Sequence, residues 1–234
     1  MKKLDVQVWS DIVCPWCYVG KRRLEKALAG FPHRGSVAIT WRSFELDPDA
    51  PPVRDPSAPY ADRLAAKYGV SPMQATAMIR RMTDTAAADG LDFRFDRVRP
   101  GNTFDAHRVL HLAADRGLAD AAKERLLRAY MTEGEPIGEA ATLARLAGDV
   151  GLDPDEVRKL LAFDDYTDEV RRDEAEAHAL GIHGVPFFVF DRRYGVSGAQ
   201  PAEVLRRVLD KVWDELPEEP ERVADGPACG PDGC

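Results

Sequence analysis

Two strand-like runs lie near the start of the chain. Residues 4–10 are largely apolar, and in residues 37–44 the apolar Val37, Ile39 and Trp41 occupy every second position. Alternation with a period of two is typical of a β-strand that buries one face. The residues between the two runs, from about residue 16 to residue 29, have a helix-like pattern. The sequence therefore predicts a β-α-β opening.

A long helical region follows residues 47–59, a segment dense in proline and aspartate that we interpret as a boundary. Ser71 followed by Pro72 is a typical helix start, because the serine hydroxyl caps the first turn and proline fits the first helical position. Glycines between the later helices favour helix ends. These helices are predicted near residues 103–116, 119–133, 140–151, 155–162 and 167–180.

The pattern returns to strands towards the carboxyl end. Residues 184–190 are apolar, residues 191–193 favour a turn and residues 194–197 supply a second strand, so the three segments predict a hairpin. Pro201 opens a final helix, whose apolar residues recur at helical spacing and would cover one face of a sheet. Residues 217–234 are acidic and rich in proline and glycine, and we expect a flexible tail there.

Length and charge limit the class of protein. The chain has 234 residues, of which 44% are hydrophobic, and this is enough for a globular protein with its own core. Its formal net charge of −8 argues against a surface that binds nucleic-acid phosphates, and no apolar run reaches membrane-spanning length. Polar residues interrupt the amino-terminal run, so it lacks the core of a secretory leader. We expect a cytoplasmic protein that binds neither nucleic acid nor membranes.

Two cysteines, Cys14 and Cys17, lie where the first strand gives way to the helix. The first turn of a helix has unpaired backbone N–H groups and a partial positive charge, which favour an anion by about 0.3–2 kcal/mol. We therefore expect Cys14 to be an exposed thiolate that attacks a substrate sulfur. Cys17, one turn later, would resolve the mixed disulfide. The alternatives for this pair are a static disulfide or half of a zinc site.

Three separated motifs give the chain a specific resemblance. They are SDIVCPWCYVGK at residues 10–21, NTFDAH at residues 102–107, and GIHGVPFFVF at residues 181–190 followed by VSGAQ at residues 196–200. In this order they resemble the DsbA-like thioredoxin family, specifically its FrnE branch, over residues 4–216. A Cys-x-x-Cys motif alone would be much less specific.

The resemblance implies an α/β fold of the thioredoxin type. In it, a β-α-β unit and a β-β-α unit are interrupted by a large all-helical insertion. Residues 1–46 and 181–216 would form the thioredoxin-like domain, residues 47–180 the linker and the helical insertion domain, and residues 217–234 the tail.

The resemblance also implies thiol-disulfide oxidoreductase chemistry without a cofactor. A sister branch, similar to 2-hydroxychromene-2-carboxylate isomerase and kappa-class glutathione transferase, usually carries serine at the position of Cys14, so the cysteine favours redox chemistry. The expected substrates are proteins with disulfides or thiols, and glutathione or a thioredoxin-type reductant is the expected partner. Because no cation is expected next to Cys14, we predict a mild couple of the reductase or isomerase type, which suits a reducing cytoplasm. We also expect a role during oxidative stress.

Two other functions stay open at this point. One is a glutathione-dependent isomerase or transferase that acts on a small aromatic or polyketide substrate. The other is a chaperone without enzymatic activity that binds peptides.

Further site residues follow from the family motifs. Thioredoxin-like proteins hold the proline that corresponds to Pro186 in the cis form, facing the redox pair, and the backbone of Val185 would then bind an extended substrate peptide. Trp16 is expected to be partly exposed and to contact substrate, with packing against the insertion as an equal alternative. By resemblance, three residues of the insertion are expected to line the substrate cleft: Asn102, Thr103 and His107.

A second pair of cysteines, Cys229 and Cys234, ends the tail and flanks a turn-forming Gly-Pro-Asp-Gly segment. We expect either a second redox pair that exchanges with the first or a simple terminal clip. A zinc site made by both pairs is a third possibility, since such sites use short cysteine spacings. His107 and His111 are four residues apart on one predicted helix, but no glutamate follows His107 as in zinc proteases, and no metal is expected there.

Overall fold

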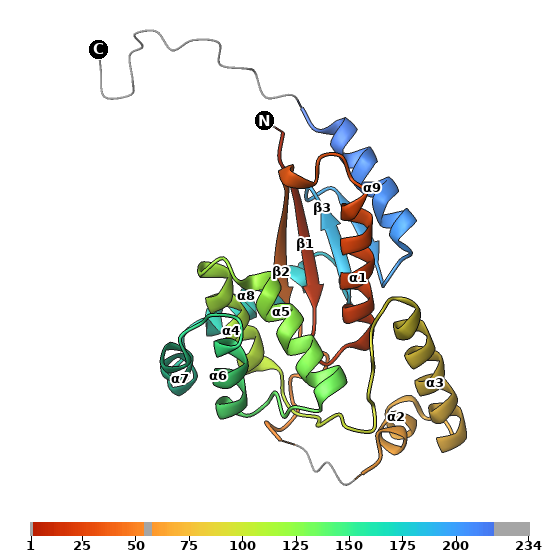
Figure 1. Ribbon diagram of the computed structural model, residues 1–234, viewed down its shortest axis with the longest axis vertical. Coiled ribbons are helices and arrows are strands. Elements are labelled where there is room, and N and C mark those ends of the chain that lie inside the picture. The colour runs from red at the N-terminus through yellow and green to blue at the C-terminus, as the bar shows by residue number, and fades with distance from the viewer. Residues whose placement is uncertain (1, 54–57, 218–234) are drawn as a thin grey trace.

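A four-stranded mixed sheet lies at the centre of the molecule, with its strands in the order β2-β1-β3-β4. The computed structural model describes residues 2–53 and 58–217 (Figure 1). Strand β1 (Leu4–Ser10) runs parallel to β2 (Val37–Ser43) and antiparallel to β3 (Phe187–Phe190), which forms a hairpin with β4 (Tyr194–Ser197). The predicted β-α-β opening and the predicted hairpin are both confirmed.

Two helices cover one face of this sheet, α1 (Pro15–Ala29) and α9 (Ala202–Glu215), and they lie side by side in Figure 1. Pro201 precedes α9 as predicted, and the apolar stripe of that helix faces the sheet. The buried residues of this layer include Leu4, Val6, Val8, Leu24, Leu28, Phe188, Phe190, Leu205, Leu209 and Val212. Burying these side chains stabilises the sheet by about 1.5–3 kcal/mol for each large residue.

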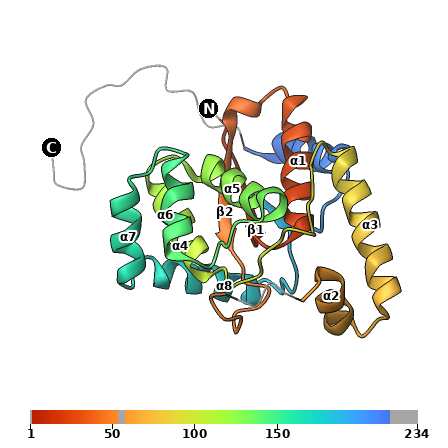
Figure 2. The same cartoon turned by 60° about the horizontal axis from the view of Figure 1, so that its bottom comes forward.

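The helical insertion lies between β2 and β3 in the sequence, and its helices form two separate groups. In the part of the chain that the structure describes, α2 and α3 form a hairpin on one side of the molecule and α4 to α7 pack together on the other (Figure 2). The bounds are α2 (Tyr60–Tyr68), α3 (Pro72–Ala88), α4 (Phe104–Asp115), α5 (Ala119–Arg128), α6 (Ala140–Gly148), α7 (Pro154–Ala162) and α8 (Thr167–Ala179).

The ends of these helices agree with the sequence pattern in most places. Ser71 caps α3 by a capping box, in which the Gln74 N–H donates to the serine hydroxyl at 3.2 Å and the Gln74 side chain accepts from the Ser71 N–H at 2.9 Å. The helix predicted over residues 119–133 ends as an α-helix at Arg128 and continues as a π-helical turn, Ala129–Glu133. Helix α2 was not placed separately by the sequence, because it is short and lacks a capping side chain.

Asp173 attaches the insertion to the sheet. This buried carboxylate of α8 accepts the Ser43 N–H at 2.9 Å and pairs with Arg42 at 2.7 Å, and its backbone carbonyl accepts the Trp9 indole N–H at 2.9 Å. The Nε2 atom of His111 contacts both Asp173 at 3.2 Å and the Ser43 hydroxyl at 3.1 Å. Because both partners meet the same ring nitrogen, these three residues do not form a serine-histidine-aspartate relay.

The insertion and the sheet also share apolar packing. Ile12, Tyr18 and Val19, next to the cysteines, belong to the same buried cluster as the helices α4 to α7. The side chains around the cysteines are therefore supplied by both parts of the chain. Within the described residues, none of the helices combines the length and the hydropathy needed to span a membrane.

Candidate active site

Cys14 and Cys17 lie at the amino-terminal end of α1. Cys14 is the residue that precedes the helix, Pro15 occupies the first helical position, and the Cys17 N–H donates to the Cys14 carbonyl at 3.1 Å. No acidic residue lies in the first turn of the helix. The partial positive charge of the helix terminus at Cys14 is therefore not offset within that turn.

The two cysteines are less exposed than the sequence analysis predicted. Cys14 was expected to be exposed, but it is only 4% exposed, and Cys17 is 1% exposed. The reason is that the loop before Pro186 and the packed residues of the insertion approach the start of α1. Both cysteines are free thiols in this conformation. Trp16, between them, is 45% exposed, as expected for a residue that can contact substrate.

The segment Val185-Pro186 faces the redox pair. The peptide bond between these two residues is cis, as the family resemblance implied. The Cys14 thiol donates to the Val185 carbonyl at 3.5 Å, although the two residues are 171 positions apart in the sequence. This contact brings a backbone carbonyl next to the candidate nucleophile, where a peptide bound at Val185 would meet the sulfur.

Gly20 permits this close approach. A Cβ atom at Gly20 would lie 2.9 Å from Cγ of Pro186 and 3.2 Å from Cζ of Phe188, so no larger residue fits without movement. Glycine inside a helix costs about 0.5–1 kcal/mol relative to alanine. Glycine at position 20 therefore costs helix stability, but it allows α1 to pack against Pro186.

We expect Gly20→Ala to lower kcat/KM for protein disulfides about tenfold, because the added methyl group displaces Pro186 and Val185 from Cys14. Gly35→Ala is the matched control, since a Cβ at Gly35 has nothing within 4 Å and should leave the rate unchanged. Steady-state kinetics of both variants check this. Equal rates for Gly20→Ala and the wild type would show that the contact with Pro186 has no role in turnover.

A buried polar cluster lies behind the cysteines. Asp11 is 0% exposed, accepts the Leu46 N–H at 2.8 Å, and lies 3.4 Å from Nε2 of His107, which is 1% exposed. Burial alone raises the pKa of Asp11, but the contacts with His107 and Leu46 lower it overall. Burial lowers the pKa of His107, and Asp11 opposes this only in part. The Ser10 hydroxyl, Asp11 Oδ1 and His107 Nε2 are buried without a hydrogen-bond partner.

Lys123 of α5 completes this cluster. It is 0% exposed, and its ammonium group donates to the Ser10 carbonyl at 3.3 Å. Burial lowers the pKa of Lys123 to about 8, against the opposing influence of Cys17, Asp11 and Cys14. Burial, together with contact with Cys14, raises the pKa of Cys17 well above its usual value. A lysine with a depressed pKa thus lies within electrostatic reach of the second cysteine.

Asn102, the first residue of the NTFDAH motif, lies beside the loop after β2. The Asn102 side chain donates to Glu45 and to the Pro48 carbonyl, both at 3.2 Å, and accepts the Phe104 N–H at 2.7 Å. Thr103 is buried at the start of α4. These positions and the burial of His107 behind Asp11 do not support the expectation that the motif lines an open cleft.

Glu45, which accepts a hydrogen bond from Asn102, is itself perturbed: burial raises the pKa of its carboxyl to about 7.

Comparison with known proteins agrees with this geometry. The model of the DSBA-like thioredoxin domain matches residues 5–210 of the chain. The chain belongs to the DsbA-like thioredoxin family. The predicted thioredoxin-like fold with a helical insertion is thereby confirmed. The tail cysteines, Cys229 and Cys234, lie outside the described residues.

Solved structures place this DsbA-like chain among related folds. A probable DsbA oxidoreductase from Streptomyces coelicolor is 49% identical with a TM-score of 0.85, covering 99% of this chain and 98% of that one. The cytosolic disulfide reductase DsbM from Pseudomonas aeruginosa, solved with GSH, is 18% identical with a TM-score of 0.63, covering 90% and 99%. A 2-hydroxychromene-2-carboxylate isomerase is 14% identical with a TM-score of 0.64, covering 90% and 97%. The last two similarities show the fold alone.

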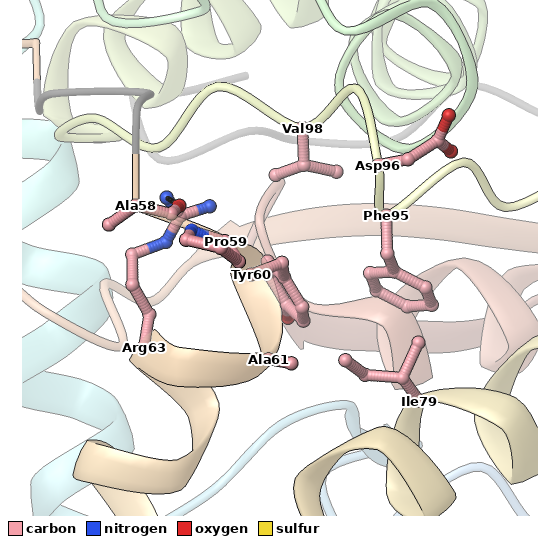
Figure 3. A pocket seen from close by; sticks show the side chains of 9 residues that line it. All are labelled: Ala58, Pro59, Tyr60, Ala61, Arg63, Ile79, Phe95, Asp96 and Val98. Carbon is pink, nitrogen blue, oxygen red and sulfur yellow. Dashed lines mark hydrogen bonds between the residues drawn. The ribbon is translucent and has the colours of Figure 1, made fainter. Parts of the chain in front are cut away.

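A pocket of about 380 Å³ opens beside α2 in this DsbA-like structure. The side chains of Tyr60, Phe95, Ile79 and Val98 surround it (Figure 3). Burial raises the pKa of Tyr60 to about 12, and Cys14 adds to this effect, so the Tyr60 hydroxyl lies within electrostatic reach of Cys14. Arg63 and Asp96 also line the pocket, so apolar and charged side chains share it.

Sequence reasoning missed four residues of this site. Gly20 and Tyr60 carry no chemical signal in the sequence, and Lys123 resembles an ordinary surface lysine of a helix. The charge of Asp11 alone would oppose a thiolate at Cys14 and does not indicate its buried position behind the pair. A chemical signal was present for Asp11 alone, as an acidic residue three positions before the cysteine motif.

Proposed function

We propose that the chain is a thiol-disulfide oxidoreductase, of the reductase or isomerase type, that acts on protein disulfides through Cys14 and Cys17. Membership of the DsbA-like family supports the class of chemistry. The observation that carries the proposal is the position of Cys14 before the first turn of α1, 3.5 Å from the Val185 carbonyl, with Cys17 in the same turn. This arrangement joins an attacking sulfur at a helix terminus, a resolving thiol and a backbone site for peptide.

The reaction has two steps. The Cys14 thiolate attacks one sulfur of the substrate disulfide, a mixed disulfide forms, and the other substrate sulfur leaves as a thiolate that takes up a proton. The Cys17 sulfur then attacks Cys14, which releases the second substrate thiol and leaves a Cys14–Cys17 disulfide. The substrate gains two electrons, and an external thiol must reduce the enzyme again. We infer a small thiol such as glutathione, or a thioredoxin-type dithiol, as that donor, in the cytoplasm.

Substrate side chains next to the reacting cysteine would meet apolar surface. Trp16 is 45% exposed, and the pocket around Tyr60 and Phe95 lies within electrostatic reach of Cys14. An extended, unfolded segment can present its backbone to Val185 and its side chains to these surfaces. This supports protein disulfides as substrates over a compact small molecule.

Insulin reduction and refolding of scrambled ribonuclease test the proposal, with the wild type and with variants of each cysteine pair. Activity that is lost in Cys14→Ser and retained in Cys229→Ser/Cys234→Ser supports it. A Cys14→Ser variant that still isomerises a small aromatic substrate with glutathione would instead favour the glutathione-dependent alternative. Suppression of aggregation by a variant without any cysteine would favour a peptide-binding chaperone.

A further inference from the structure

Lys123 is a buried lysine without a charged partner at hydrogen-bonding distance. It is 0% exposed, and the Ser10 carbonyl at 3.3 Å accepts its hydrogen bond. Among residues 2–53 and 58–217, no carboxylate lies within salt-bridge distance of its nitrogen. The ring of Trp41 also faces this ammonium group, with its centroid 5.7 Å from the nitrogen. Because a fully buried lysine is rare without a carboxylate partner, Lys123 needs an explanation other than packing.

Lys21 shows the usual arrangement for comparison. It is 2% exposed, but its nitrogen contacts Glu25, Asp120 at 3.2 Å and Glu124 at 3.3 Å. Burial alone lowers the pKa of Lys21, but these carboxylates raise it overall. Lys21 is therefore a cation held in an ion network, whereas Lys123 has no such network.

The groups that face Lys123 belong to the redox site. Cys17 has the largest electrostatic influence on it, followed by Asp11 and Cys14. The charged or titratable groups with the largest influence on it are Cys14, Cys17 and Lys21 of α1 and Asp11 of the loop before α1, and Lys123 in turn influences His107 of α4, which contacts Asp11. Lys123 itself comes from α5, so the insertion contributes a titratable group to the redox pair.

Cys17 must lose its proton inside the protein. It is 1% exposed, so bulk solvent does not reach its sulfur, and burial and Cys14 raise the pKa of this thiol. Asp11 is a poor proton acceptor, because His107 and the Leu46 N–H keep the pKa of its carboxyl low. Burial gives Lys123 a pKa of about 8, so the neutral amine is accessible near neutral pH. Among these neighbours, Lys123 is therefore the group best suited to accept the proton of Cys17 near neutral pH.

We propose that Lys123 accepts the proton of Cys17 in the resolving step, and that His107 positions Asp11 so that its carboxylate stabilises the resulting ammonium group. This inference rests on the proposed function, because it concerns the second step of that reaction. The S–H bond of Cys17 breaks, and the proton passes to the Lys123 amine, directly or through one water molecule. The Cys17 sulfur forms a bond to the Cys14 sulfur, and the substrate sulfur leaves with the electron pair of the mixed disulfide.

Single-turnover kinetics with a peptide disulfide that carries a different fluorophore on each half separates the two steps. Release of the first labelled half reports capture by Cys14, and release of the second reports resolution by Cys17. The full chain is used in a Cys229→Ser/Cys234→Ser background, so that the tail cysteines do not contribute. Acid quenching and mass spectrometry measure the mixed disulfide directly.

Lys123→Arg is the decisive variant, because arginine keeps the positive charge but does not give up its proton. We expect Lys123→Arg and Lys123→Met to slow resolution about 100-fold, with the mixed disulfide accumulating. Capture by Lys123→Arg, measured in Cys17→Ser, should stay within about threefold of the parent. Lys159→Arg, a change at an exposed lysine of α7, should change neither step. Normal resolution in a folded Lys123→Arg would show that Lys123 acts only as a charge and would overturn the proposal.

The pH dependence of the resolving step, measured in the wild type, tests the proposal without any substitution of a buried residue. Resolution should rise with pH and reach half its maximum near the pKa of Lys123, about 8. A rise that begins only above pH 9, as expected for unassisted ionisation of the Cys17 thiol, would contradict a role for Lys123.

His107 is a positioning residue in this account, and its test is the same pH profile. Without the imidazole, Asp11 is less easily ionised, and Lys123 loses part of the negative charge that favours its ammonium form. His107→Leu should therefore move the midpoint of resolution to lower pH, and His107→Gln, which keeps an N–H donor, should restore it in part. An unchanged midpoint in His107→Leu would remove His107 from the proposal. Failure of capture itself would count against the proposed function instead.

Discussion

Replacement of Cys14 by serine is expected to lower the rate of insulin reduction about 1000-fold or more, to the level of the uncatalysed reaction. A serine hydroxyl is not ionised at neutral pH, so the positive end of α1 has no anion to stabilise and the mixed disulfide cannot form. The measurement is turbidimetric insulin reduction with a fixed concentration of reduced glutathione or dithiothreitol.

The serine variant should keep its fold. Cys14 lies before the first helical turn, and its side chain contributes no cap to α1. Circular dichroism and a thermal melt that match those of the wild type would therefore show that the loss is chemical. The double variant Cys229→Ser/Cys234→Ser is the matched control with two fewer thiols. Insulin reduction by Cys14→Ser at a rate near that of the wild type would rule out Cys14 as the nucleophile.

Replacement of Cys17 by serine is expected to lower turnover about 100-fold and to trap the substrate on Cys14. Capture does not need Cys17, but release of the mixed disulfide does, since only a second thiol in the same turn can attack Cys14 efficiently. Non-reducing gels and intact mass spectrometry should show the enzyme joined to one substrate chain. Dithiothreitol should release that chain.

The tail cysteines provide a second comparison for this experiment. If Cys229 or Cys234 can also attack Cys14, the mixed disulfide will be short-lived in Cys17→Ser and stable in the triple variant Cys17→Ser/Cys229→Ser/Cys234→Ser. Equal lifetimes in both variants would exclude the tail from the resolving step. Absence of any mixed disulfide in the triple variant would contradict the order of attack proposed for Cys14 and Cys17.

Local patterns in the sequence were sufficient for most of the fold. The alternation in residues 37–44 gave β2, the apolar stripe after Pro201 gave α9, and the serine-proline pair at residues 71–72 gave the start of α3. These elements depend on interactions within a few residues, which periodicity and capping residues reflect directly. The cysteine motif and Pro186 were recognised for the same reason, since each carries its chemical signal locally.

Contacts between distant parts of the chain could not be predicted in this way. Lys123 reaches the Ser10 carbonyl across 113 positions, and nothing in the pattern of α5 distinguishes it from a solvent-exposed lysine. His107 was expected in a cleft, but the packing of α4 turns it towards Asp11. The low exposure of Cys14 has a similar origin, because the groups that cover the start of α1 come from the insertion and from the loop before β3.

The rate at which iodoacetamide alkylates Cys14 at pH 7 tests the central claim most directly. The triple variant Cys17→Ser/Cys229→Ser/Cys234→Ser leaves this sulfur as the only thiol. The thiolate is the species that reacts, and the positive end of a helix favours an anion. The folded variant should therefore be alkylated faster than the same chain unfolded in urea, although Cys14 is only 4% exposed. A rate no higher than that of the unfolded chain, or a sulfur that does not react while the protein is folded, would contradict the account.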